Sequence, residues 1–263
     1  MDAVAVAQFA PGADREANLA VMAGLAATAA ERGATLVVFP EYSSYFTPEM
    51  GPDWMTAAEP LDGAFVAGLA AIAVELNVIV VAGLLETAGE KAHNTVVAIA
   101  PDGTRLATYR KLHLYDAFGS HESDWIVAGE ISAPETFAWA GFTVGLQTCY
   151  DIRFPEVTRT LVDAGADLVL VPAEWVRGPL KEHHWRTLLT ARAIENTIYI
   201  AAADHAPPVG AGNSMVLDPM GVELATVGEA ADVALAWPDS SRISSVRESN
   251  PSLRLRRFGT RPL

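Results

Sequence analysis

The segment GFTVGLQTCYD, residues 141–151, determines how the rest of the chain is interpreted. Its apolar residues predict a buried strand that ends at Cys149, the only cysteine among 263 residues. The next stretch, residues 154–162, predicts a helix that opens with proline. A cysteine between a strand end and a helix N-terminus lies near the positive end of the helix dipole, which favours the nucleophilic thiolate. We therefore expect a reactive thiol; the alternative is a small buried apolar residue.

Strand-like and helix-like segments alternate along the whole chain without a linker. Asp14 is placed to cap a helix that Gly33 ends. Further helices are predicted at 64–76, 155–164 and 181–195, and strands at 4–9, 35–39, 78–82, 95–100, 105–109, 142–148, 168–171, 198–202, 214–217, 222–226 and 233–237. This mixture of βα units and hairpins predicts an α/β fold with mixed sheets, in a single domain over residues 1–263.

Composition excludes several classes of function. A formal net charge of −14 argues against a nucleic-acid partner, because phosphate binding needs clustered Lys and Arg. The apolar runs are too short to span a bilayer, and the N-terminus lacks the basic region of a signal peptide, so we expect no membrane association. A lone cysteine forms no intrachain disulfide, which fits a cytoplasmic protein.

The charge is uneven. Residues 242–263 hold six arginines and one acid, a net charge of +5, so residues 1–241 carry −19. This basic C-terminal tail is either a solvated segment or one that docks on an acidic surface of its own subunit or of a neighbour.

Two other charged residues follow apolar strands as Cys149 does. Glu41 follows the strand at 35–39, and Lys111 follows the strand at 105–109. Catalytic side chains commonly project from such strand ends. Together they suit thiol-based acyl transfer: Glu41 as the general base, Lys111 as a charge for the oxyanion, and the backbone N–H of Tyr150 as a second donor.

Other chemistries find less support in the residues. His113 lies two residues past Lys111 and is an alternative base for a Cys–His pair. The adjacent pair His183 and His184 has poor metal-ligand spacing, and the chain lacks a second cysteine and an HxxxH motif, so we expect no metal. No glycine-rich nucleotide-binding motif occurs, and no cofactor is expected.

Three segments resemble the signature segments of the nitrilase superfamily, the carbon–nitrogen hydrolases, and they occur in the right order. They are FPEY at 39–42, YRKLHLYD at 109–116 and CYDIRFPE at 149–156. The resemblance continues through Trp175, ARAIEN at 191–196 and GNSMVLDPMG at 212–221, so it covers nearly the whole chain.

The resemblance implies a four-layer α-β-β-α sandwich with two mixed sheets, which dimerises into an extended sandwich. It implies the triad Glu41, Lys111 and Cys149, and a further catalytic glutamate, Glu122, that orients Lys111 and the substrate. It also implies a homodimer, with the basic tail at 242–263 packing at the subunit interface.

The CYDIRFPE segment is most similar to amidase-type branches. We therefore expect hydrolysis of a small carboxamide to a carboxylate and ammonia through a cysteine thioester. Hydrolysis of N-carbamoyl amino acids and of nitriles are alternatives within the family. A catalytically silent binding protein on the same fold and an unrelated cysteine hydrolase with a histidine base are alternatives of other kinds.

Aromatic side chains are candidates for narrowing the acyl pocket, and we single out Tyr42 and Trp175, together with Tyr150, as substrate-binding residues. Core packing is the alternative for each aromatic ring. Arg177 and His184 are candidates for binding a substrate carboxylate, although the sequence does not show that they reach it.

Overall fold

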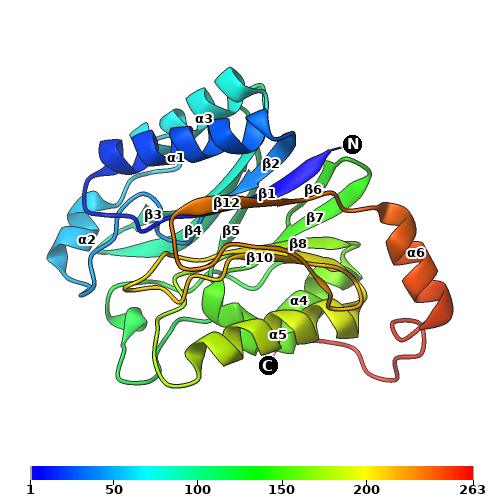
Figure 1. The fold of residues 1–263 in the computed structure, drawn as a ribbon. Coiled ribbons are helices and arrows are strands. Elements are labelled where there is room, and N and C mark those ends of the chain that lie inside the picture. Colours follow the sequence, from blue (N-terminus) through cyan, green and yellow to red (C-terminus); the bar gives the residue numbers. More distant parts are fainter. Residues whose placement is uncertain (1, 263) are drawn as a thin grey trace.

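Two six-stranded mixed sheets pack face to face, and helices cover both outer surfaces (Figure 1). The computed structural model describes residues 2–262. One sheet has the strand order β12-β1-β2-β3-β4-β5 and the other β11-β10-β9-β8-β7-β6. Helices α1 and α3 cover the first sheet, and α4 and α5 cover the second (Figure 1). The predicted four-layer α-β-β-α sandwich is confirmed.

The first sheet contains β1 (Ala3–Gln8), β2 (Ala34–Val38), β3 (Ile79–Ala88), β4 (Lys91–Ile99), β5 (Arg105–Arg110) and β12 (Asp232–Ala236). The second contains β6 (Thr136–Trp139), β7 (Phe142–Leu146), β8 (Leu168–Pro172), β9 (Tyr199–Ala203), β10 (Met215–Leu217) and β11 (Glu223–Thr226). The helices are α1 (Arg15–Glu31), α2 (Pro52–Ala57), α3 (Ala64–Leu76), α4 (Pro155–Asp163), α5 (Lys181–Asn196) and α6 (Ser240–Ser249), with 3₁₀ turns η1 (Glu122–Asp124) and η2 (Cys149–Arg153).

The central strands are apolar on both faces because each face meets another layer. In β1, Val4 and Val6 pack between the sheets, whereas Ala5 and Ala7 pack under the helices. β8 behaves in the same way, since its leucines join the core between the sheets and its valines pack under the helical layer. Successive side chains of a strand point to opposite faces, so a strand buried on both sides has a continuous apolar sequence.

The structure adds elements that hydrophobic patterning did not predict. Strand β6 pairs antiparallel with β7, and the short helix α2 and the tail helix α6 are also new. α6 is a largely polar helix, with only Ile243 and Val246 buried, so it has little apolar periodicity. No helix within residues 2–262 has the length and apolar character needed to cross a membrane.

The basic tail contacts acidic residues of its own subunit. Arg242 lies 3.1 Å from the carboxylate of Asp218, and Arg256 pairs with Asp163 on α4. Both pairs are partly exposed, so each is worth at most about 1 kcal/mol. Packing of this tail at a subunit interface stays a prediction, as do the single-domain assignment and the homodimer.

Gly83 on β3 allows the segment that follows β2 to lie close to β3. Its N–H donates to the carbonyl of Pro40 at 3.1 Å. A Cβ at this position would lie 2.7 Å from both the Cα of Glu41 and the backbone N of Tyr42. The backbone of Glu41 and Tyr42 is buried and has little room to shift, so the absence of a side chain at Gly83 allows Glu41 to lie this close to β3.

We expect Gly83→Ala to lower the free energy of unfolding by about 1–3 kcal/mol, because the new methyl overpacks against backbone. Urea unfolding measures the change. Gly24→Ala on α1 is the matched control: its Cβ would meet nothing within 4 Å, and alanine in an exposed helix should stabilise by about 0.5–1 kcal/mol. Equal stability of Gly83→Ala and the wild type would contradict the close approach.

Candidate active site

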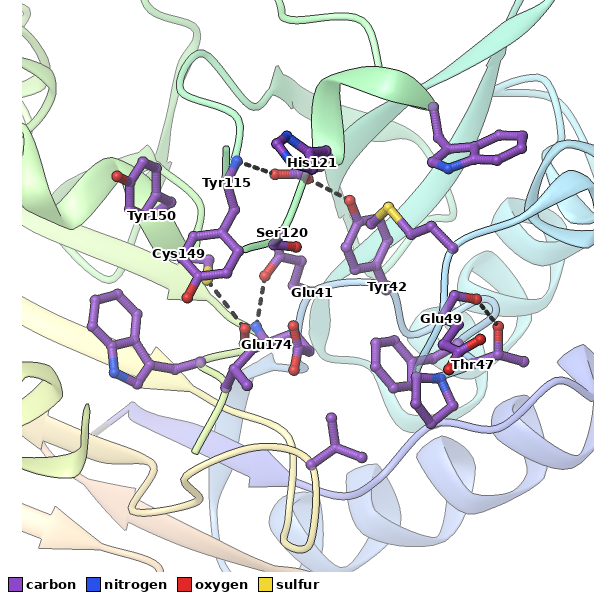
Figure 2. A pocket seen from close by; sticks show the side chains of 18 of the residues that line it. Glu41, Tyr42, Thr47, Glu49, Tyr115, Ser120, His121, Cys149, Tyr150 and Glu174 are labelled. Atoms are coloured by element: carbon purple, nitrogen blue, oxygen red, sulfur yellow. Dashed lines mark hydrogen bonds between the residues drawn. The ribbon is translucent and has the colours of Figure 1, made fainter. Parts of the chain in front are cut away.

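Three side chains from separate strand ends meet at one pocket. Glu41 follows β2, Lys111 follows β5 and Cys149 follows β7. All three line a cavity of about 540 Å³, and Glu122 from η1 lines it too. Figure 2 shows Glu41 and Cys149 beside each other in this cavity, with Tyr115 and Tyr42 along its wall. The four residues that the sequence singled out as catalytic are therefore close neighbours in space.

The ammonium group of Lys111 lies between two carboxylates. Its Nζ is 2.8 Å from Oε1 of Glu41, and 3.1 Å and 2.9 Å from the two oxygens of Glu122. The exposed side-chain fraction is 2% or less for all three residues. Buried charges this close to one another are fixed by their partners, so Lys111 holds both glutamates in place.

Neutral donors complete this arrangement. The Nδ2 of Asn94, on β4, donates to Glu41 at 2.6 Å and to Glu122 at 3.0 Å. The hydroxyl of Tyr42 donates to Glu122 at 2.5 Å, and the backbone N–H of Tyr115 donates to the same carboxylate. The sequence analysis did not identify Asn94 as a site residue. The only signal was a polar amide next to the apolar part of a strand.

The two glutamates have different acidities. Burial, together with the charge of Glu122, raises the pKa of Glu41, and the ammonium of Lys111 only partly offsets this. Burial also acts to raise the pKa of Glu122, but Lys111 and hydrogen bonds from Tyr42, Tyr115 and Asn94 lower it overall. Burial alone would lower the pKa of Lys111; both carboxylates outweigh it and raise that pKa well above its ordinary value. Of these two glutamates, Glu41 is thus the one that accepts a proton more readily.

Cys149 begins the turn η2 and sits in an unusual backbone conformation, with φ of 43°. A left-handed φ is strained for a residue with a side chain and occurs often at functional sites. The side chain is 5% exposed, and its Sγ lies 3.4 Å from the carbonyl oxygen of Glu174 (Figure 2). The strand-to-turn placement predicted from the sequence is therefore present.

The expectation that a helix dipole favours the thiolate is wrong. Burial is the largest effect on the Cys149 thiol; together with the charge of Glu41 it raises the pKa well above the ordinary value, against the opposing charge of Lys111. The helix α4 begins only at Pro155, beyond the five-residue turn η2, so its N-terminus is not adjacent to the sulfur. Cys149 rests as a thiol, and its activation needs a base.

Asp151 joins the cysteine turn to the chain that follows Lys111. Its buried carboxylate accepts hydrogen bonds from the backbone N–H groups of Thr148 and His113 and from the hydroxyl of Tyr109. The ring of His113 also contacts it, with Nδ1 at 2.8 Å, and stacks on Phe154. His113 does not line the cavity that holds Cys149. This position gives no support to His113 as the base of a Cys–His pair.

Glu174, two residues after β8, is a second feature that sequence reasoning missed. Its backbone N–H donates to Oε2 of Glu41 at 2.6 Å. Its side chain lines the cavity, and its buried Oε1 has no partner among the residues that the structure describes. Burial and the charges of Glu41 and Asp204 raise the pKa of Glu174 well above the ordinary value. In the sequence, Glu174 follows an apolar strand as Glu41 does, and this position is the signal that could have identified it.

A buried imidazole supports the backbone behind Glu41. The Nε2 of His205 lies 2.7 Å from the carbonyl oxygen of Glu41, which makes this nitrogen the protonated one. Burial lowers the pKa of His205 to about 4, so the ring is neutral near pH 7. The ring also packs edge-on against Phe46, another residue of the cavity wall.

The proposed substrate-binding aromatics all reach the cavity, in different ways. Tyr42, Tyr150 and Trp175 line it. Tyr42 directs its hydroxyl to Glu122, and Trp175 donates its indole N–H to the carbonyl of Lys181. These two rings thus also organise the site.

The sequence candidates for binding a substrate carboxylate are engaged elsewhere. Arg177 lines the cavity, but its guanidinium lies 3.3 Å from Glu182 and 3.2 Å from Glu229. His184 does not line the cavity, and its Nδ1 lies 3.5 Å from Arg153.

Comparisons of the sequence and of the structure with known proteins identify the same family. The family model for carbon–nitrogen hydrolases matches residues 3–248. A deaminated glutathione amidase of Escherichia coli O157:H7 is 39% identical over 257 residues, 97% of each chain. Another, from Synechocystis, is 36% identical over 244 residues, 88% of this chain and 89% of the relative.

Solved structures with the same fold include an amidase from Nesterenkonia sp., with a TM-score of 0.79 and 28% identity over 97% of this chain and 96% of that one. A mutant of this amidase carries acrylamide added to its active-site cysteine. The Caenorhabditis elegans NitFhit protein has a TM-score of 0.88 and 30% identity over 97% of this chain, which spans 65% of the NitFhit chain. The chain therefore belongs to the carbon–nitrogen hydrolase family, as an amidase acting on carbon–nitrogen bonds other than peptide bonds.

Proposed function

We propose that this protein hydrolyses a small-molecule carboxamide to a carboxylate and ammonia through a thioester on Cys149. The observation that carries the proposal is the Glu41 carboxylate, anchored by Lys111, Asn94 and the N–H of Glu174, in the same cavity as the thiol. Relatives are named as deaminated glutathione amidases, and in a mutant of the Nesterenkonia amidase acrylamide has added to the active-site cysteine. Cys149 is the only cysteine here that can take that role.

The reaction begins with a proton transfer. Glu41 takes the proton from the Cys149 thiol as the sulfur attacks the amide carbon, and a tetrahedral oxyanion forms. The ammonium of Lys111 and the backbone N–H of Tyr150 stabilise that oxyanion, each donor contributing on the order of 3 kcal/mol. Protonated Glu41 then passes its proton to the departing nitrogen, so that ammonia leaves and the acyl group stays on sulfur.

Hydrolysis of the thioester uses the same groups. With ammonia gone, Glu41 is again a carboxylate and removes a proton from water, which attacks the acyl carbon. The second tetrahedral intermediate collapses, protonated Glu41 returns its proton to the departing sulfur, and the product leaves as a carboxylic acid that ionises in water. Glu122 stays ionised throughout and keeps the Lys111 ammonium charged and oriented, because its own pKa is lowered while that of Lys111 is raised.

Ammonia release from a panel of short aliphatic amides, ω-amides, N-carbamoyl amino acids and nitriles tests the proposal. We expect turnover of amides. Cys149→Ala should lower kcat by at least about 10³-fold, and Glu41→Gln by about 10²- to 10⁴-fold, with both proteins folded by circular dichroism. Intact mass should show an acyl adduct on the wild type and none on Cys149→Ala. Silence across the panel would favour a binding protein, and full activity of either variant would end the assignment.

The acid side of the pH profile should report Glu41. It must be ionised to accept a proton, and burial raises its pKa above 4.5, so kcat/KM should fall as pH drops through a midpoint above 4.5. Glu122→Gln removes a charge that raises the Glu41 pKa, so its acid limb should move to lower pH even as its rate falls. If the acid limb of the kcat/KM profile had the same midpoint in Glu122→Gln as in the wild type, the titrating group would not be Glu41.

Lys111→Arg should lower kcat by about 10²-fold or more, because a planar guanidinium does not replace a compact ammonium between two carboxylates. Steady-state kinetics measure the loss. Lys91→Arg is the matched control, since Lys91 is exposed and its Nζ donates a hydrogen bond to the carbonyl of Ser123, outside the cavity. Normal turnover by Lys111→Arg would show that the oxyanion geometry given above is wrong.

A further inference from the structure

Glu174 contacts both the base and the nucleophile of the proposed reaction through its backbone. Its N–H donates to Oε2 of Glu41 at 2.6 Å, and its carbonyl oxygen lies 3.4 Å from Sγ of Cys149 (Figure 2). It lies two residues beyond β8, a strand buried along its whole length, and the N–H of Ala173 continues the pairing of β8 to the carbonyl of Ala203. The backbone of Glu174 is therefore fixed beside the atoms that react.

The carboxyl group of Glu174 is left without a protein partner. The side chain lines the cavity that holds Cys149, and its Oε1 is buried with no hydrogen bond to any residue within 2–262. After burial, the charge of Glu41 is the largest effect on the pKa of Glu174, so the two carboxyl groups lie near each other. Buried polar atoms nearly always have a hydrogen-bond partner, so an unpaired oxygen on a cavity wall points to a molecule that enters the cavity.

The proposed cycle brings a water molecule to this place. While the amide is bound, its nitrogen lies near Glu41, because this carboxyl group supplies the proton for ammonia. Once ammonia leaves, water takes the vacated space, with its oxygen near the acyl carbon and one hydrogen toward Glu41. A cavity of about 540 Å³ leaves room for water beside a short acyl group. A bound water needs about two to four polar partners, and the unpaired Oε1 of Glu174 is available as one besides Glu41.

We propose that the side chain of Glu174 holds the water molecule that hydrolyses the thioester on Cys149. This rests on the function proposed above and adds a residue to its second half. The water donates one hydrogen to Glu41 and the other to Oε1 of Glu174. Its oxygen bonds to the acyl carbon as the first proton passes to Glu41; the carbon–sulfur bond then breaks, and that proton returns to the sulfur.

The role of Glu174 is confined to one half of the reaction. Its own protonation state does not change, because the proton moves only between water, Glu41 and the sulfur. Attack of the thiol on the amide needs no water. Glu174 therefore serves hydrolysis of the thioester and not its formation.

Two substrates that form the same thioester test this division. Propionamide and p-nitrophenyl propionate both transfer a propionyl group to Cys149, and rapid mixing follows the release of ammonia or nitrophenolate. Glu174→Met removes both carboxyl oxygens at similar side-chain length. We expect it to give a burst of about one product per site, at a rate within about threefold of the wild type. Its steady-state rate should fall about 10- to 100-fold with both substrates, because the water is no longer held in line, and intact mass should show the propionyl adduct accumulating.

A conservative variant and a surface variant complete the experiment. Glu174→Gln keeps an acceptor oxygen on a side chain of the same length, so its steady-state rate should stay within about fivefold of the wild type. Glu75→Met is the matched control, since Glu75 is exposed on α3 and does not line the cavity. Both phases of this control should match the wild type.

Three results would overturn the role of Glu174: an unchanged steady-state rate in Glu174→Met, equal losses in its burst and steady state, or a Glu174→Gln variant as slow as Glu174→Met. A wild type that is acylated by the ester but releases ammonia from no amide would instead remove the proposed amide hydrolysis. The two phases with the ester would still decide whether Glu174 holds the water.

Discussion

One buried ammonium shared by two carboxylates organises this molecule's chemistry. Lys111 lies within 3.1 Å of oxygens on Glu41 and Glu122, and all three side chains are almost fully buried. Three charges in such surroundings are stable only with complete hydrogen bonding, which Asn94, Tyr42 and the N–H groups of Tyr115 and Glu174 supply. Because these groups come from several strands and loops, the whole sandwich must form before the site exists.

The asymmetry of the two glutamates follows from their partners. Glu122 accepts more donors and keeps a lowered pKa, whereas Glu41 has fewer and keeps a raised one. Two residues of the same type are thus separated into a permanent anion and a proton acceptor. The raised pKa of Cys149 completes this division of roles, since a sulfur that rests protonated requires the neighbouring acceptor.

Much of this was accessible from the sequence. Apolar runs followed by Glu41, Lys111 and Cys149 predicted strand ends, from which catalytic side chains commonly project. Asn94 and Glu174 were not predicted, because their significance depends on which distant atoms surround them. The acidity of Cys149 was misjudged for a related reason: local order along the chain indicates a nearby helix, but burial and a carboxylate from another strand decide the pKa. Strand β6 and helices α2 and α6 are short or polar, so tertiary contacts rather than periodicity define them.

The resting protonation of Cys149 has a consequence beyond hydrolysis. Peroxides and disulfides react with thiolates, and their attack on a buried thiol of raised pKa is slow. Because Cys149 is 5% exposed and its pKa is raised, we expect it to react with oxidants more slowly than an exposed thiolate does. In the proposed mechanism, the proton that Glu41 removes from Cys149 is thus also the one that slows oxidation of the sulfur while no substrate is bound.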